Sequence, residues 1–379
     1  MNFYRETKDL RSYKDTKIGR IPKEWEVVRL GQIMLLKNGE RPLTTEGGIF
    51  PVYGANGIMG YTQNFLVNND FTIIIGRVGA SGEIHLGKGK IWISDNAIYS
   101  EKYEREKIYI PFIYQLLKFK KISRFASKST HPIITQSFLN SLLIPLPPLP
   151  EQKKIAEILL TVDEAIEKVD EAIAKTERLK KGLMLNLLKG IGYKENWKIV
   201  RLEEVVEIYD NERVPLNETQ RLEMKGKYPY CGANGILDYI NDYIFEGEFI
   251  LLAEDGGYWS KFQQSAYIMS GKFWANNHVH VLKAIDNIAS NQFLMYILNY
   301  LDLTPYVVGS TRGKLNQKDM RNIKIPLPPL EEQQKIAEIL STVDKRLELL
   351  KRKKEKLERV KEGLMNDLLT GRKRVRSEA

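Results

Sequence analysis

The sequence contains a single cysteine, Cys231, among 379 residues. One cysteine excludes an intrachain disulfide and a zinc site built from several thiolates, and it favours a reducing compartment. No apolar run approaches the ~18 residues that a membrane span requires. The polar start, Met1 to Lys8, also lacks the apolar core of a signal peptide. We therefore expect a soluble, cytoplasmic protein.

Catalytic signatures are also missing. The chain has no Asn-Pro-Pro-Tyr or Asp-Pro-Pro-Tyr motif of an amino-methyltransferase, no Gly-x-Gly-x-x-Gly motif and no nuclease carboxylate-lysine cluster. The segment Gly82–Gly89 resembles a phosphate-binding loop, but Gly89 replaces the required Ser or Thr. His278 and His280 would share one face of a strand without a third metal ligand nearby, which favours a structural role. We expect no metal, no cofactor and no enzymatic activity of the chain's own.

One proline-rich motif is present twice, at an offset of 181 residues. The copies are Ile144-Pro-Leu-Pro-Pro-Leu-Pro-Glu-Gln152 and Ile325-Pro-Leu-Pro-Pro-Leu-Glu-Glu-Gln333, and Ile-Ala-Glu-Ile-Leu follows each after a short interval. Proline is tolerated in the first turn of a helix, and Pro-Leu-Pro-Pro favours an extended approach to it. A ligand for an SH3-type domain is the alternative, but the motif adjoins a helix both times.

The segments after the two motifs predict long helices, because apolar residues recur at alternating steps of three and four. The Lys, Arg and Glu residues between them indicate the solvated flanks of a coiled coil, with DNA binding by these flanks as the alternative. The seam positions are Ile155, Leu159, Val162, Ile166, Val169, Ile173, Thr176, Lys180, Leu183 and Leu187, and, 181 residues later, Ile336, Leu340, Val343, Leu347, Leu350, Lys354, Leu357, Lys361, Leu364 and Leu368.

The repeat also covers the segments before the motifs, where short strand-like runs dominate. In each copy a Trp-centred strand, at Trp25 and Trp197, is followed by Gly-Ala-Asn-Gly-Ile, which predicts a turn with positive φ. A ligand role for Asn56 and Asn234 is the alternative. We expect an α+β protein with two mostly-β domains. The expected segments are an arm at 1–20, a first domain at 21–150, a helix at 151–190, a second domain at 191–330, a helix at 331–371 and a tail at 372–379.

The net charge of +10 is uneven, since residues 1–150 carry 21 Lys and Arg against 13 Asp and Glu, whereas residues 190–330 carry 15 against 17. An excess of basic residues suits a polyanion partner. The second domain has no such excess, so nucleic-acid binding there would require a local basic patch. Basic and hydroxyl-rich stretches precede both proline motifs, and their side chains donate to phosphates and base edges. An ordinary solvated loop is the alternative. The DNA-binding candidates are Arg77, Lys88, Lys121, Arg124, Lys128, Ser129, Thr130, Gln136, Tyr258, Trp259, Lys261, Ser310, Thr311, Arg312, Lys314 and Gln317.

The doubled proline-helix motif, each copy after a variable domain that opens with a Trp-centred strand, resembles the specificity subunit of type I restriction-modification enzymes. The resemblance covers residues 17–371. It implies two target-recognition domains that bind an asymmetric, bipartite site on double-stranded DNA. It also implies assembly with two methyltransferase subunits and with restriction subunits, to which methylation and cleavage belong. It implies no particular base-contacting residues, because the recognition domains differ between members.

The connections predict how the helices pair. The second domain begins just after the first helix and ends just before the second, so helices that enter and leave it at neighbouring points must be antiparallel. Such a pair would relate the two domains by a pseudo-twofold axis, which suits two separated half-sites on a duplex. Two other hypotheses remain. Salt-dependent DNA binding would be absent from a purely structural coiled-coil protein, and a methyl-transfer assay would reveal a stand-alone enzyme.

Overall fold

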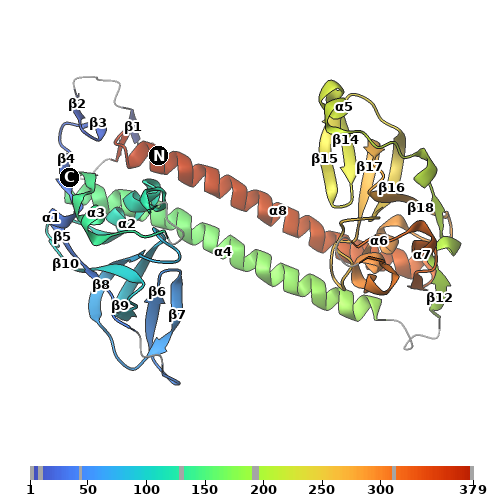
Figure 1. The fold of residues 1–379 in the computed structure, drawn as a ribbon, viewed down its shortest axis with the longest axis horizontal. Coiled ribbons are helices and arrows are strands. Elements are labelled where there is room, and N and C mark those ends of the chain that lie inside the picture. Colours follow the sequence, from blue (N-terminus) through green and yellow to red (C-terminus); the bar gives the residue numbers. More distant parts are fainter. Residues whose placement is uncertain are drawn as a thin grey trace. The chain divides into compact units, whose positions relative to one another are not determined.

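The computed structural model describes residues 4–6, 12–41, 45–127, 132–189, 196–309 and 313–375. The chain forms two compact units (Figure 1). The first unit contains residues 1–169 together with 353–379, and the second contains residues 170–352. Each unit therefore holds one domain and a part of both long helices. No helix in the described part of the chain has the length and apolarity that crossing a membrane needs.

The domain of the first unit is built on a six-stranded sheet. Its strand order is β5 (Met34–Asn38), β10 (Ala97–Tyr103), β8 (Val67–Gly76), β9 (Ile84–Ile93), β6 (Phe50–Gly54) and β7 (Gly57–Thr62). Neighbouring strands are antiparallel except for the parallel pair β6 and β9. Successive side chains of a strand point to opposite faces. Ile73 and Ile75 accordingly pack with helix α2 (Ile110–Phe119), while Ile74 packs in a second cluster with Ile91.

The second unit repeats this arrangement. Its sheet order is β13 (Val206–Ile208), β18 (Val279–Ala284), β16 (Phe245–Ala253), β17 (Ala266–Ala275), β14 (Lys225–Gly232) and β15 (Gly235–Ile240), with β14 and β17 parallel. Helix α6 (Asn291–Tyr300) covers it as α2 covers the first sheet, and α5 (Glu218–Glu223) precedes β14. The predicted fold class, α+β with two mostly-β domains, is confirmed.

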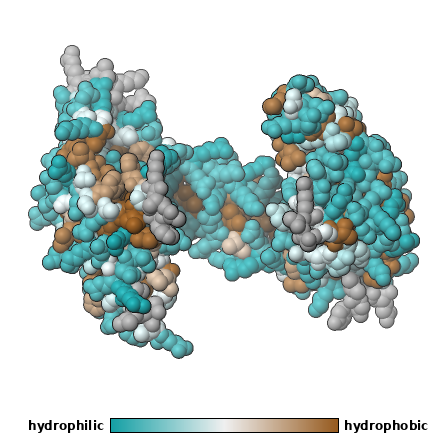
Figure 2. Space-filling model, in the orientation of Figure 1, coloured by the Kyte–Doolittle hydropathy of each residue, from teal (hydrophilic) through white to brown (hydrophobic). Residues whose placement is uncertain are grey.

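The Gly-Ala-Asn-Gly segments form the predicted turns between β6 and β7 and between β14 and β15. Gly57 and Gly235 have φ values of 102° and 125°, in the region that L side chains avoid. Asn234 donates a hydrogen bond to the Gly256 carbonyl at 3.0 Å, so it joins the hairpin to the loop after β16. Hydrophobic side chains of the β14–β15 hairpin, including Leu237 and Tyr239, are exposed, and Figure 2 shows brown patches over this part of the second unit.

The proline motifs run as short strands into the long helices. Strand β11 (Leu143–Leu146) pairs with β4 (Glu26–Arg29) and leads into α4 (Leu149–Leu188). Strand β19 (Lys324–Leu327) pairs with β12 (Lys198–Arg201) and leads into α8 (Leu330–Leu368). Two tryptophans join these parts, since the indole of Trp25 donates to Glu151 at 3.0 Å and that of Trp197 donates to Glu332 at 3.2 Å.

The glutamine that ends each motif, Gln152 or Gln333, is fully buried. The Oε1 atom of Gln152 accepts from the Tyr109 amide, and its Nε2 atom donates to the carbonyls of Lys107 and Pro147, at 2.8–2.9 Å. Gln333 makes the same three contacts with Ser290, Ile288 and Pro328. The glutamine therefore ties the start of each long helix to the segment before α2 or α6.

The predicted helix seam is also observed, because none of its twenty positions is exposed. Three of these positions are lysines, namely Lys180, Lys354 and Lys361. Lys361 pairs with Asp163 in the first unit and Lys180 pairs with Asp344 in the second, both at 2.5 Å. The acidic partners, which are also 181 residues apart, explain how lysine is accommodated in an apolar seam. In the second unit Glu177 faces Lys351 while Lys180, later in α4, pairs with Asp344, earlier in α8, so the two helices run antiparallel there.

The N-terminal arm, whose packing the sequence left open, contacts the C-terminal end of the chain. Strand β1 (Tyr4–Glu6) pairs antiparallel with β20 (Lys373–Val375), and β2 (Tyr13–Thr16) forms a hairpin with β3 (Gly19–Pro22). Tyr13 donates to the Gly371 carbonyl at 2.9 Å. Arg374 forms ion pairs with Glu151 at 2.6 Å and with Glu24 at 2.7 Å. Part of the expected tail is thus a strand of the first unit.

Candidate nucleic-acid interface

In the first domain, three separate segments meet beside the end of β8. The loop after β8 contains Gly82, where an added β-carbon would collide with the backbone of Ser123 in the 3-10 helix Ile122–Phe125. The Ile134 amide donates to the Arg77 carbonyl at 3.1 Å, which brings in the segment before helix α3 (Gln136–Ser141). The loop after β8, the 3-10 helix and this segment therefore form one surface.

This surface brings together three of the predicted DNA-binding residues. Arg77 is partly exposed, Lys121 adopts a left-handed backbone with φ of 49°, and Arg124 is exposed. Lys88 lies apart from them in the middle of β9, where its ammonium group is 5.9 Å from the centre of the Phe71 ring. The candidates Lys128, Ser129 and Thr130 lie outside the described residues.

The second domain has the same arrangement after β16. Lys314 forms backbone bridges with Val308 and with Asp255 in the loop that follows β16. Its ammonium group lies 3.1 Å from Glu254, and the Lys314 side chain is 47% exposed. We name the backbone from Gly313 to Gln317 the Lys314 segment. The candidates Ser310, Thr311 and Arg312, which immediately precede it, lie outside the described residues.

The aromatic candidates of the second domain have different environments. Tyr258 is 60% exposed, whereas Trp259 is partly buried against the core. A β-carbon added at Gly313 would lie 2.8 Å from the Trp259 ring, so only glycine allows the Lys314 segment to approach so closely. Lys261 packs its ammonium group 4.5 Å from the centre of the Tyr300 ring. Tyr258 is thus the aromatic candidate that is free to stack on a base.

Two glutamine candidates, Gln136 and Gln317, direct their amides into the protein. Gln136 donates to the Leu36 carbonyl at 2.5 Å, and Gln317 donates to the Asp210 carboxylate at 3.0 Å. Both residues occupy the first turn of a short helix, α3 or α7 (Gln317–Arg321). Their side chains hold the candidate surfaces in place, and whether they also contact DNA stays a prediction.

A buried charge cluster lies beneath the Lys314 segment, and the sequence pattern gave no sign of it. His280 is fully buried between the Asp210 carboxylate, at 2.6 Å from Nδ1, and the Leu315 carbonyl, at 2.8 Å from Nε2. Arg213 adds a guanidinium group, with a 2.6 Å contact to Glu254 and a 3.5 Å contact to Asp210. Burial would raise the pKa of Asp210, but hydrogen bonds from His280 and the Val281 amide, together with Arg213, hold it below its usual value.

Asp210, Glu254 and His280 place ligand-type atoms within 4.8 Å of one another, a spacing that could hold a metal ion. The sequence pattern did not predict that Asp210 and Glu254 lie beside His280, because both carboxylates are far from it along the chain. The Arg213 guanidinium, however, contacts both carboxylates, and both ring nitrogens of His280 already have partners. A cation among these groups would have to displace Arg213. The geometry therefore fits an ion-pair network, in agreement with the structural role expected for His280.

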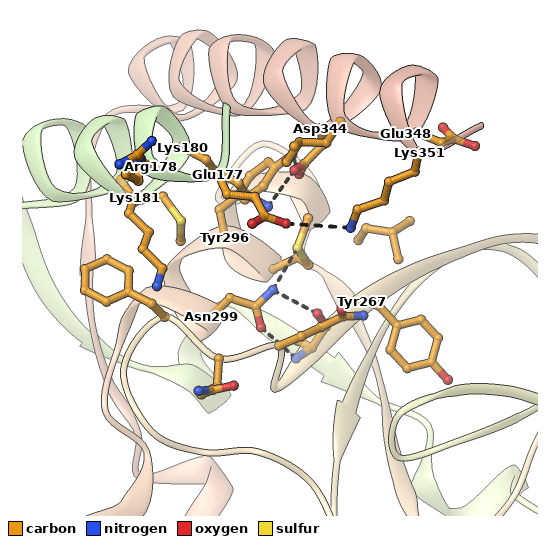
Figure 3. Close-up of a pocket in the computed structure, with 18 of the residues that line it drawn as sticks. Glu177, Arg178, Lys180, Lys181, Tyr267, Tyr296, Asn299, Asp344, Glu348 and Lys351 are labelled. Carbon is orange, nitrogen blue, oxygen red and sulfur yellow. Dashed lines mark hydrogen bonds and ion pairs between the residues drawn. The ribbon is translucent and has the colours of Figure 1, made fainter. Parts of the chain in front are cut away.

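A separate cleft of about 1010 Å³ lies inside the second unit, between α4, α8 and the domain (Figure 3). Its acidic and basic groups are largely paired with each other. Asp344 accepts from Tyr296 at 2.7 Å and pairs with Lys180, and Glu177 faces Lys351 at 4.0 Å. Asn299 is held by the backbone of Ala266. None of the DNA-binding candidates that the structure describes lines this cleft.

The fold defines a protein with two similar α+β domains, each attached to paired helices. The model of one family, described as the type I restriction modification DNA specificity domain, matches residues 22–176 and 194–359. The chain belongs to this family, as the resemblance of the doubled motif indicated. It is accordingly the non-catalytic, DNA-recognition subunit of a type I restriction-modification system. The structural coiled-coil protein and the stand-alone enzyme are thereby set aside.

Individual relatives agree with this assignment. The chain is 28% identical over 438 residues to the type I restriction enzyme MjaVIII specificity subunit of Methanocaldococcus jannaschii, covering 100% of this chain and 98% of that one. A putative type I restriction enzyme specificity subunit of Haemophilus influenzae is 41% identical over 152 residues, which are 40% of this chain and 38% of the relative. The crystal structure of the type I restriction-modification S subunit from M. genitalium has the same fold, with a TM-score of 0.73, 20% identity, and coverage of 91% and 96%.

Proposed function

We propose that each domain of this chain reads one half of an asymmetric, bipartite DNA site. The supporting observation is that both domains build the same surface, from the loop after β8 or β16 and the segment before α3 or α7. The scaffold is shared while the side chains on it differ. Such divergence is what two domains need if they recognise different base sequences on the same backbone geometry.

The candidate residues on these surfaces suit DNA. Arg and Lys donate to phosphates and guanines, and an exposed tyrosine can stack on or pack against bases. In the first domain we assign this role to Arg77, Lys121 and Arg124 with the neighbouring Lys128, Ser129 and Thr130. In the second we assign it to Tyr258 and Lys314 with the neighbouring Ser310, Thr311 and Arg312. Lys88, Lys261 and Trp259 are secondary candidates, because they lie apart from these surfaces or pack inward.

The long helices have two further roles in this proposal. They fix the number of base pairs between the half-sites, and they dock two methyltransferase subunits, to which restriction subunits add in the full complex. The domains themselves correspond to residues 21–150 and 191–330. An antiparallel seam with matched ion pairs at Asp163 and Asp344 supports a stiff spacer, because a buried seam resists bending.

A domain exchange tests the proposal. Residues 21–143 are replaced by the matching domain of a relative with a known site, and the hybrid is assembled with its methyltransferase subunit. Sequencing of methylated adenines then gives the site of the hybrid and of the original chain. We expect one half of the site to change and the other half and the spacer to stay the same. A change in both halves would contradict separate reading by two domains.

A further inference from the structure

His280 joins the central sheet of the second domain to the Lys314 segment. Its Nδ1 atom faces a carboxylate oxygen of Asp210 and its Nε2 atom faces the Leu315 carbonyl, at 2.6 and 2.8 Å. Carboxylate and carbonyl oxygens only accept hydrogen bonds, so both ring nitrogens must donate. An imidazole that donates twice carries a proton on each nitrogen. Two acceptor oxygens on opposite sides of the ring are the contact pattern that an imidazolium satisfies and a neutral imidazole does not.

The contacts of the Lys314 segment converge on the groups around this ring. The Leu315 carbonyl binds His280, and its amide donates to the Glu254 carbonyl at 2.7 Å. The Lys314 ammonium pairs with the Glu254 carboxylate, and the Gln317 amide donates to Asp210. Asp210 and Glu254 lie 2.6 and 3.7 Å from the His280 ring. Removing the imidazolium would leave these two carboxylates, 3% and 12% exposed, with Arg213 as their remaining buried cation.

We propose that His280 is a positioning residue for DNA recognition by the second domain. Its charge holds the Asp210 and Glu254 carboxylates in place, and through them and the Leu315 carbonyl it fixes the Lys314 segment at the DNA-facing surface. The inference rests on the proposed function, since it requires the Lys314 segment to face DNA. A displaced segment would present Lys314 in several positions, so discrimination at the second half-site would fall.

The first domain provides an internal comparison. Ala97 pairs with Gly76 in the first domain as Val279 pairs with Ala253 in the second. The next residue along the strand, Ile98, is therefore the counterpart of His280. Ile98 is fully buried in the apolar core. Gln136, the counterpart of Gln317, donates to a backbone carbonyl and not to a carboxylate. At these two described positions the first domain has an apolar side chain and a neutral hydrogen bond, so we expect a dependence on His280 at the second half-site and not at the first.

The test uses the chain assembled with its methyltransferase subunit and duplexes that contain the site found by methylation mapping. Affinities are measured for the intact site and for duplexes scrambled in either half. We expect His280→Phe, which keeps a ring but has no donor, to lower discrimination at the second half-site by about tenfold. Discrimination at the first half-site should stay within about twofold. His280→Gln, which can donate to the Leu315 carbonyl, should lose less, and Ile98→Val in the first domain serves as the matched control.

Two further measurements separate the possible failures. Nitrogen NMR of the chain labelled at its four histidines should show one imidazole with both nitrogens protonated at neutral pH, and that signal should be absent from His280→Gln. A neutral His280, or a folded His280→Phe protein with unchanged discrimination, overturns the inference. If His280→Phe does not fold, the spectrum and the His280→Gln affinities decide. If Lys314→Ala leaves binding to every duplex unchanged, the assignment of this surface to DNA fails. If Lys314→Ala weakens binding while the His280 variants change nothing, the inference about His280 fails and the assignment of the surface stands.

Discussion

Gln333 and Gln152 satisfy three backbone groups each at the start of a long helix, and they are fully buried. Truncating such a side chain leaves buried donors and acceptors unpaired, at a cost of about 1–3 kcal/mol. We expect Gln333→Ala to lower the free energy of unfolding by about 2–3 kcal/mol in urea titrations. Gln334→Ala, at the neighbouring exposed position, should change it by less than about 0.5 kcal/mol. Equal stability of the two variants would contradict the role given to Gln333.

Asp210 gives the second unit a dependence on acid pH. Its pKa is held below the usual value, so its carboxylate contributes stability above about pH 4 that is lost as pH falls through the lowered pKa. We expect Asp210→Asn to be less stable than the original chain at neutral pH, with the difference shrinking as pH falls below about 4. Urea unfolding across a pH series measures this, with Asp286→Asn, at an exposed position, as the control. Parallel stability curves for the original and Asp210→Asn chains would refute it.

The basic candidates should act on separate halves of the site. Lys314→Ala and Arg312→Ala are expected to weaken binding through the second half-site, and Lys128→Ala through the first. A lost phosphate contact should weaken binding to all sequences and reduce the salt slope by about 1, whereas a lost base contact should cost about 1–3 kcal/mol at one position. Affinity measurements at several salt concentrations distinguish the two. Lack of any effect from all three would mean that these residues face solvent.

The glutamines also show what a sequence pattern cannot decide. Basic, hydroxyl and amide residues before both proline motifs predicted a DNA surface, and an amide suits DNA and protein partners equally. Gln136 and Gln317 point inward because a backbone carbonyl and a buried carboxylate lie within reach, from strands far away in the sequence. His280 was interpreted as structural because no metal site was evident nearby in the sequence. Its contact with Asp210 could not be foreseen, because Asp210 is 70 residues away along the chain. Such contacts depend on the tertiary fold.

At the scale of elements, the long helices and many strands follow from local pattern. The helix seam repeats over many turns, and the β-branched run that ends in Ile73 to Ile75 marks a strand. The neighbour relations do not follow from it. The parallel pairing of β6 with β9, and of β14 with β17, joins strands separated by others along the chain, and periodicity within a strand carries no information on its partner. The order of strands therefore became known only from the structure.

The helices also permit a test of the proposed spacer role. They contain 40 and 39 residues, or roughly 60 Å at ~1.5 Å per residue. Inserting seven residues after Thr176 in α4 and after Leu347 in α8 keeps the seam in register. It should lengthen the pair by about 10 Å, or roughly three base pairs.

The measurement for this insertion is the methylated site of the mutant assembled with its methyltransferase subunit. We expect unchanged half-sites with a longer spacer between them. The inserted length also rotates one half-site relative to the other by about a third of a turn of the duplex, so the level of methylation is recorded together with the site. A folded, active mutant that retains the original spacer would refute the spacer role. Insertion of seven residues in α4 alone, which breaks the pairing, is the control.

At the scale of the whole molecule, the purified chain should have no catalytic activity. It belongs to the family of DNA-recognition subunits, and the sequence contains no methyltransferase motif. We expect no methyl transfer from a labelled donor and no cleavage of DNA by the chain alone. Adding the methyltransferase subunit should produce methylation of one defined site. Activity of the isolated chain that a substitution within it abolished would contradict this.

The pairing of β1 with β20 has a consequence for how such a chain can be encoded. Because Tyr4–Glu6 and Lys373–Val375 lie in adjacent strands, a peptide that joined β20 to β1 would close the chain into a ring. Such a closed chain could be opened at another loop. Cutting it instead between the helix that ends at Leu188 and the strand that begins at Lys198 would give a gene whose halves appear in the opposite order. The rearranged gene would specify the same contacts within the protein. The fold therefore does not require either domain to come first along the chain.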